Sequence, residues 1–104
     1  MGHPRGRRPT ALETFAEITR RVIRKDGFEG SLPTVLLPAR REVRVLEGIP
    51  ADVAHEEAAL RWADGTAQPG EEYLVAFKVS PSQFKVVRRA GGVREEGLFD
   101  LDAA

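Results

Sequence analysis

The chain has 104 residues, of which 41% are hydrophobic and 31% are charged, and its 16 basic side chains balance its 16 acidic ones. This length predicts a single domain and this composition excludes a disordered chain, while no apolar run approaches the roughly 18 residues of a membrane-spanning helix. The absence of cysteine excludes disulfides, thiolate nucleophiles and metal sites built on cysteine.

The charges are unevenly distributed although they sum to zero. Residues 1–50 carry ten basic and six acidic side chains and residues 51–104 carry six and ten, so the two halves have net charges of +4 and −4. Complementary halves favour self-association, and a neutral total argues against non-specific nucleic-acid binding as the main activity. The N-terminus lacks an apolar signal segment and the composition is rich in arginine and alanine, so we expect a cytoplasmic, bacterial protein.

The N-terminal third should form a flexible arm and a helix. Residues 1–9 place three arginines among glycine and proline, which predicts the arm. Thr10 and Glu13 have the spacing of a capping box, so a helix should begin there and end at Gly27. Its apolar positions form one stripe for the core: Leu12, Phe15, Ala16, Thr19, Val22 and Ile23. Its opposite face carries Arg20, Arg21, Arg24 and Lys25.

Two pairs of strands are predicted. The first pair is residues 34–37, enclosed by prolines, and residues 42–47, which alternate. The second pair is residues 72–79, which are apolar on both alternating faces, and the β-branched run 84–89 after a turn. A strand that is apolar on both faces must be covered on both, or nearly so.

A second helix is predicted over residues 51–64, entered through Pro50. On its helical wheel Val53 and Leu60 lie on one side, and Trp62 lies among alanines on the other. Because one face should dock on the sheet, a large apolar side chain remains on the other face. We expect a loop, a tail or a partner protein to cover it.

The last segment leaves two alternatives open. A Gly-Gly pair predicts a turn or hinge, and residues 93–104 then combine Leu98 and Phe99 with acidic side chains. This segment should be either an additional strand or a C-terminal tail that binds elsewhere. The order α-β-β-α-β-β over residues 10–92 predicts an α+β domain with a four-stranded antiparallel sheet, or five-stranded if the last segment pairs, and both helices on one face.

One cluster has the residue types of a catalytic site. On a helix, Asp52, His55 and Glu56 occupy positions i, i+3 and i+4, so an imidazole and two carboxylates can project together as a general base or a weak metal site. Carboxylates in a first helical turn are also expected from the helix dipole alone. Because no His-Glu-x-x-His, Gly-x-Ser-x-Gly or phosphate-binding glycine motif is present, we expect no cofactor and no metal.

Three functions therefore stay open. We expect first a small interaction or regulatory module that binds itself as a homodimer, or another protein. Its interface candidates are Trp62, Val53, Leu60, Leu98 and Phe99. The first alternative is a nucleic-acid-binding protein that uses the arm and an arginine face, although no aromatic residue interleaves with these arginines. Its candidates are Arg20, Arg21, Arg24, Arg40 and Arg41. The second alternative is an enzyme with a site centred on His55.

Overall fold

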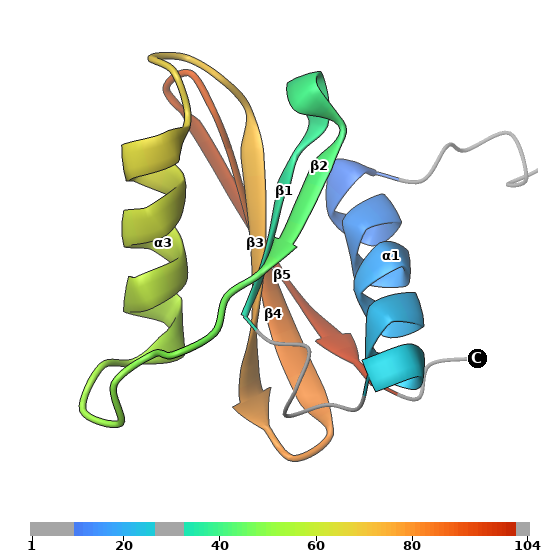
Figure 1. Ribbon diagram of the computed structural model, residues 1–104. Helices are drawn as coiled ribbons and strands as arrows, with labels where there is room; N and C mark the ends of the chain where they lie inside the picture. The colour runs from blue at the N-terminus through green and yellow to red at the C-terminus, as the bar shows by residue number, and fades with distance from the viewer. Residues whose placement is uncertain (1–9, 27–32, 102–104) are drawn as a thin grey trace, which may run out of the picture.

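The computed structural model describes residues 10–26 and 33–101, so the arm predicted over residues 1–9 lies outside the described residues. Two α-helices and a five-stranded antiparallel sheet occur in the order α-β-β-α-β-β-β, which confirms the α+β class (Figure 1). The elements are α1 (Ala11–Asp26), β1 (Thr34–Leu37), the 3-10 turn η2 (Pro38–Arg40), β2 (Glu42–Val45), α3 (His55–Thr66), β3 (Tyr73–Ser80), β4 (Gln83–Ala90) and β5 (Val93–Asp100). Neither helix in the described part is long and apolar enough to cross a membrane.

Helix α1 begins where the sequence predicts. The Thr10 backbone N–H donates to Glu13 Oε1 at 2.8 Å and the Glu13 N–H donates to Thr10 Oγ1 at 3.1 Å, so both halves of the capping box form. The apolar stripe buries Phe15 and Ala16 completely and Ile23 almost completely. This stripe packs on β3, β4 and β5.

The spatial order of the strands is β2-β1-β3-β4-β5, which leaves β2 and β5 at the edges of the sheet. The turn between β4 and β5 needs only two residues, and Gly91 adopts a positive φ of 62° that suits glycine at the first of them. Strand β5 then pairs with β4 along its whole length, from the pair Ala90 and Val93 to the pair Gln83 and Asp100. Of the two alternatives for this segment, the strand is confirmed.

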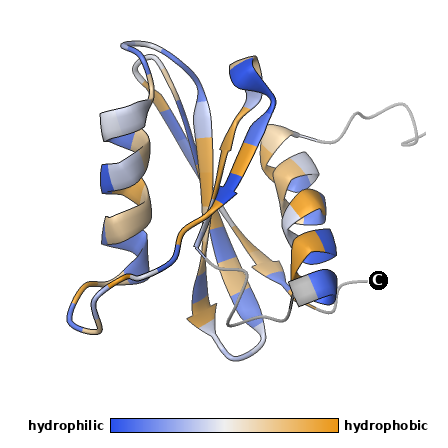
Figure 2. Ribbon diagram, viewed as in Figure 1, coloured by the Kyte–Doolittle hydropathy of each residue, from blue (hydrophilic) through white to orange (hydrophobic). Residues whose placement is uncertain are grey.

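The two helices cover opposite faces of the sheet, so the prediction that both lie on one face is wrong (Figures 1 and 2). Strand β3 gives the reason. Its side chains Tyr73, Val75 and Phe77 pack in the cluster beneath α3. Its side chains Leu74 and Ala76 pack in the cluster beneath α1. Since one layer can shield only one set of alternating side chains, a central strand that is apolar on both faces needs a helix on each side.

Helix α3 spans His55–Thr66, which corrects the predicted range 51–64. The Val53 N–H donates to Pro50 O at 3.0 Å, so the chain makes a turn before the helix begins. This turn leaves Asp52 and Val53 outside the helix. The predicted helical wheel used Val53 for one apolar side, and the predicted catalytic cluster used Asp52.

Helix α3 has one apolar face rather than the two that the sequence predicts. Ala59 and Ala63 are fully buried one helical turn apart, and Leu60 and Trp62 pack beside them in the same cluster as half-buried residues. Alanine lets the helix approach the sheet closely, so the larger side chains on both flanks reach it. The loop after β2 and the Arg44 guanidinium, 5.5 Å from the indole centroid, lie beside Trp62 on the side that the sequence leaves uncovered.

This close approach predicts the effect of a larger side chain beneath α3. The substitution Ala63→Leu should lower the free energy of unfolding by about 1–3 kcal/mol, because a fully buried site has no room for the added methyl groups. The matched variant Ala58→Leu, at a half-buried position beside an open groove, should change it by less than about 0.5 kcal/mol. Urea denaturation measures both, and equal losses would contradict this packing.

Candidate functional site

The predicted catalytic cluster does not form. Asp52 lies in the turn before α3, so it does not share a helical face with His55 and Glu56. His55 is the first residue of the helix and is exposed. Within residues 10–26 and 33–101, no group of three histidine or carboxylate side chains converges as a metal site requires. The geometry therefore gives an enzyme centred on His55 no support.

The candidate arginines lie on separate elements. Helix α1 carries Arg20, Arg21 and Arg24, and the turn between β1 and β2 carries Arg40 and Arg41. Arg40 donates two hydrogen bonds to the carboxylate of Glu71, at 2.7 and 3.0 Å, and a third to the Thr66 carbonyl at 3.0 Å. Arg41 adopts the left-handed backbone conformation (φ 52°) that closes this turn. Arg40 thus fastens the β1–β2 turn to the end of α3 and the start of β3, which is a structural role.

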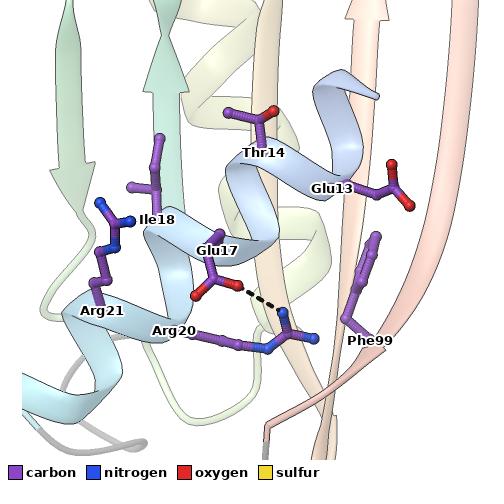
Figure 3. A pocket seen from close by; sticks show the side chains of 7 residues that line it. All are labelled: Glu13, Thr14, Glu17, Ile18, Arg20, Arg21 and Phe99. Carbon is purple, nitrogen blue, oxygen red and sulfur yellow. Dashed lines mark hydrogen bonds and ion pairs between the residues drawn. The ribbon is translucent and has the colours of Figure 1, made fainter. Parts of the chain in front are cut away.

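Three candidates that the sequence assigns to two different functions come together beside α1. Arg20, Arg21 and Phe99 line an open groove of about 530 Å³ that follows the outer surface of this helix as far as β5 (Figure 3). The Arg20 guanidinium lies 5.8 Å from the ring centroid of Phe84 and 5.9 Å from that of Phe99. It also donates to Glu17 Oε2 at 3.1 Å, and only 11% of its side chain is exposed. Arg20 is therefore a paired packing residue at the edge of the sheet.

The backbone of β5 faces β4 and the outer edge alternately. The Leu101 N–H donates to Ser82 O at 2.8 Å, so Leu101 directs its backbone groups toward β4. Backbone direction alternates along an antiparallel strand, so positions 93, 95, 97 and 99 also face β4, and positions 94, 96, 98 and 100 face outward. A hydrogen bond from α1 supports this assignment. Arg20 Nε donates to the Asp100 carbonyl at 2.9 Å, so this carbonyl faces away from β4.

Three residues of β5 consequently present backbone hydrogen-bonding groups at the edge. The N–H and C=O of Arg94, Glu96 and Leu98 point outward, and no strand among the described residues lies beyond β5. Such a row of groups is a template for a further strand. This edge offers unused backbone groups that the element order alone does not reveal.

The charged side chains near this edge are paired within the sheet. Arg88 Nη1 lies 2.7 Å from Glu95 Oε1, and Arg94 Nε lies 2.9 Å from Glu96 Oε2. Lys85 also donates a hydrogen bond to Glu96, and this bond is the main reason that the pKa of Glu96 is lowered. The edge therefore carries ionised groups with little unbalanced charge to repel another chain.

Apolar groups of β5 occupy both faces of the strand. Val93 and Leu98 are 55% and 57% exposed, which is high for such side chains. Leu98 lies on the face of α3. On the face of α1, which also carries Val93, the Phe99 ring stacks against Phe84 and lies over Gly97, where an added Cβ would come within 2.9 Å of the ring. Gly97 is thus a glycine because Phe99 occupies the space above it.

A polar cluster that the sequence analysis missed joins α3 to the sheet. The Tyr73 hydroxyl donates to Asp64 Oδ1 at 2.6 Å and accepts from Arg89 Nη1 at 3.4 Å. Burial and the bond to Asp64 raise the pKa of Tyr73, so its hydroxyl stays protonated as the donor. Tyr73 and Arg89 are direct cross-strand partners, which the hairpin register could have indicated. The arrangement stabilises the end of α3 and leaves no free base.

Comparisons with protein-family models, with curated proteins and with solved structures find no match to this chain. No activity or partner can therefore be inferred from a relative. Of the two edge strands among the described residues, β5 is the longer and offers more unused backbone groups, and the groove of α1 lies beside it.

The position of Arg20 predicts a large effect on stability. The substitution Arg20→Ala should lower the free energy of unfolding by about 2 kcal/mol, because it removes the cover of two aromatic rings and leaves the Asp100 carbonyl without this donor. Arg24→Ala should cost less than about 0.5 kcal/mol, since Arg24 is 63% exposed and lies 3.9 Å from Glu17. Urea denaturation distinguishes the two. Equal losses would show that Arg20 is not a packing residue.

The clamp between Arg40 and Glu71 predicts a dependence of stability on pH. The hydrogen bonds from Arg40 and from the Gln68 backbone lower the pKa of Glu71 below its ordinary value of 4.5. The stability that the clamp contributes is therefore complete above pH 4.5 and disappears as the pH falls through the lower folded-state pKa. Glu71→Gln should be less stable at pH 7 and lose less stability on acidification.

A carboxyl-carbon NMR titration should place the pKa of Glu71 below 4.5. The control Glu57→Gln removes an exposed ion pair with Arg61 and should leave stability nearly unchanged at pH 7. A Glu71 carboxyl that titrates at its ordinary value, or above it, would contradict the clamp.

Proposed function

We propose that this protein is a small interaction module that self-associates through the edge of β5. The observation that carries the proposal is the row of outward-facing backbone groups on Arg94, Glu96 and Leu98. An extended chain that pairs with an exposed strand gains a ladder of main-chain hydrogen bonds, which is a common mode of protein recognition.

The side chains of the edge support the same function. Charged residues normally protect an edge strand against pairing with another chain. Here the charges are balanced by ion pairs within the sheet, and Leu98 and Val93 are more than half exposed. The opposite edge is a weaker candidate, because β2 has four residues against the eight of β5.

The proposal replaces the interface that the sequence favours. Trp62 and Leu60 pack in the core cluster beneath α3, so that helix needs no partner to cover a second apolar face. Leu98 and Phe99, the other interface candidates, both belong to β5. We propose a cytoplasmic location for the module, which fits a chain without cysteine.

This function predicts that the protein is a dimer at micromolar concentration and that Leu98→Pro makes it a monomer. Proline at position 98 removes an outward-facing N–H, so it blocks pairing at the edge and leaves the hydrogen bonds to β4 intact. Sedimentation equilibrium measures the association state. Circular dichroism and amide exchange of β4 check that the variant is folded.

A matched pair of charge substitutions tests the site without proline. Leu98→Glu should weaken the dimer, because it adds a carboxylate to an edge that already carries Glu96 and Asp100, whereas Val79→Glu, at a valine of β3 that is 47% exposed, should not. If the wild-type protein stays monomeric at every concentration and salt, the proposal is wrong. It is also wrong if both glutamate variants dimerise as strongly as the wild type.

A further inference from the structure

We infer that the strand added to β5 is the β5 strand of a second copy, paired antiparallel about a twofold axis that passes through Gly97. This inference rests on the self-association proposed above and names its geometry. It follows from the direction of the backbone groups, from the charges along the strand and from the glycine at its centre.

The backbone restricts where the axis can lie. Hydrogen bonds form only if outward-facing residues of one strand oppose outward-facing residues of the other. Positions 94, 96, 98 and 100 face outward, so even-numbered residues must oppose even-numbered residues. An axis between two residues would oppose even and odd positions, so the axis must pass through a residue.

The side-chain charges of β5 distinguish the remaining positions of the twofold axis. An axis through Glu95 or Glu96 would set that carboxylate directly against its own copy, and an axis through Leu98 would set Glu96 against Asp100. Like charges that are directly opposite destabilise a strand pair, and opposite charges stabilise it. Among the axes near the centre of β5, only the one through Gly97 avoids all these contacts, and it places Arg94 opposite Asp100 of the other copy on both sides of the axis.

The same axis fits the length and the centre of β5. It pairs the whole strand, with Val93 opposite Leu101 of the second copy at each end. At the centre, Gly97 opposes Gly97 as a pair that is not hydrogen-bonded, where backbones approach to about 4.5 Å between Cα atoms. A glycine inside a strand often marks such a close approach. The Phe99 ring already fills the space above Gly97, so nothing larger fits there.

The contacts already made at the edge are compatible with this pairing. The Asp100 carbonyl accepts from Arg20, and its second lone pair is available to the Arg94 N–H of the other copy. The two five-stranded sheets would join into one continuous sheet. Because the axis is perpendicular to this sheet, both α1 helices would lie on one face, and the two grooves that contain Arg20 and Phe99 would flank the axis.

Engineered thiols test the register, because the natural chain has no cysteine. An axis through Gly97 places position 96 opposite position 98 of the second copy, at about 5.5 Å between Cα atoms, which is within the range for a disulfide. When Glu96→Cys and Leu98→Cys chains are mixed and mildly oxidised, the mixed disulfide should exceed either homodisulfide several-fold. The matched control Val79→Cys should cross-link with neither.

A charge reversal gives a second, independent measurement. Arg94→Asp should raise the dimer dissociation constant about tenfold, because two opposite-charge contacts become like-charge contacts. Arg94→Asp combined with Asp100→Arg should restore it to within about threefold of the wild type. A single reversal that leaves the dimer unchanged would overturn the inference.

The outcomes separate this inference from the proposed function. A dominant homodisulfide of Glu96→Cys or of Leu98→Cys would move the axis to that residue and overturn the inference, while β5 remained the interface. A dimer in which neither thiol cross-links would overturn both, because the interface would lie elsewhere. A monomeric protein would also overturn both.

Discussion

The structure depends on the burial of one strand from both sides. Five consecutive residues of β3, from Tyr73 to Phe77, are at most 4% exposed although their side chains alternate between the two faces. Burying a side chain such as valine, leucine or phenylalanine stabilises a fold by about 1.5–3 kcal/mol, so neither face can be left to water. The chain meets this requirement by placing α1 on one face and α3 on the other. The three layers follow from this strand.

The same constraint leaves β5 partly covered. Helix α3 packs on β3 and β1, while α1 extends across β3 and β4 to β5. Strand β5 is therefore shielded on the face of α1 and bare on the face of α3, where Leu98 is exposed and Glu96 is held by ion pairs. The proposed interaction surface lies on an edge strand, two positions from the doubly buried strand, where the core needs little of the side-chain surface.

Local sequence patterns predict the local structure well, but they do not predict contacts between residues that are far apart in the chain. The capping box at Thr10 and the strand 34–37 appear as expected, because neighbouring residues determine them. The side of the sheet that α3 covers is set by β3, which follows it in the chain, so the wheel of α3 could not reveal it. The predicted cluster at His55 failed for a local reason, because a turn before α3 takes the residues expected in its first turn. Arg40 and Glu71 are 31 positions apart, and no pattern in the sequence connects them.

The charges of β5 can limit pairing and also direct it. Backbone hydrogen bonds supply attraction but do not distinguish one register from a register shifted by two residues, since both present the same groups. Side chains must make that choice. Along β5 an arginine lies near the start, acidic residues lie in the middle and an aspartate lies at the end. With this order, every axis near the centre except the one through Gly97 opposes two carboxylates. The order of charges along β5 would therefore favour the one strand with the complementary order, which is a second copy of β5 with its Asp100 opposite Arg94.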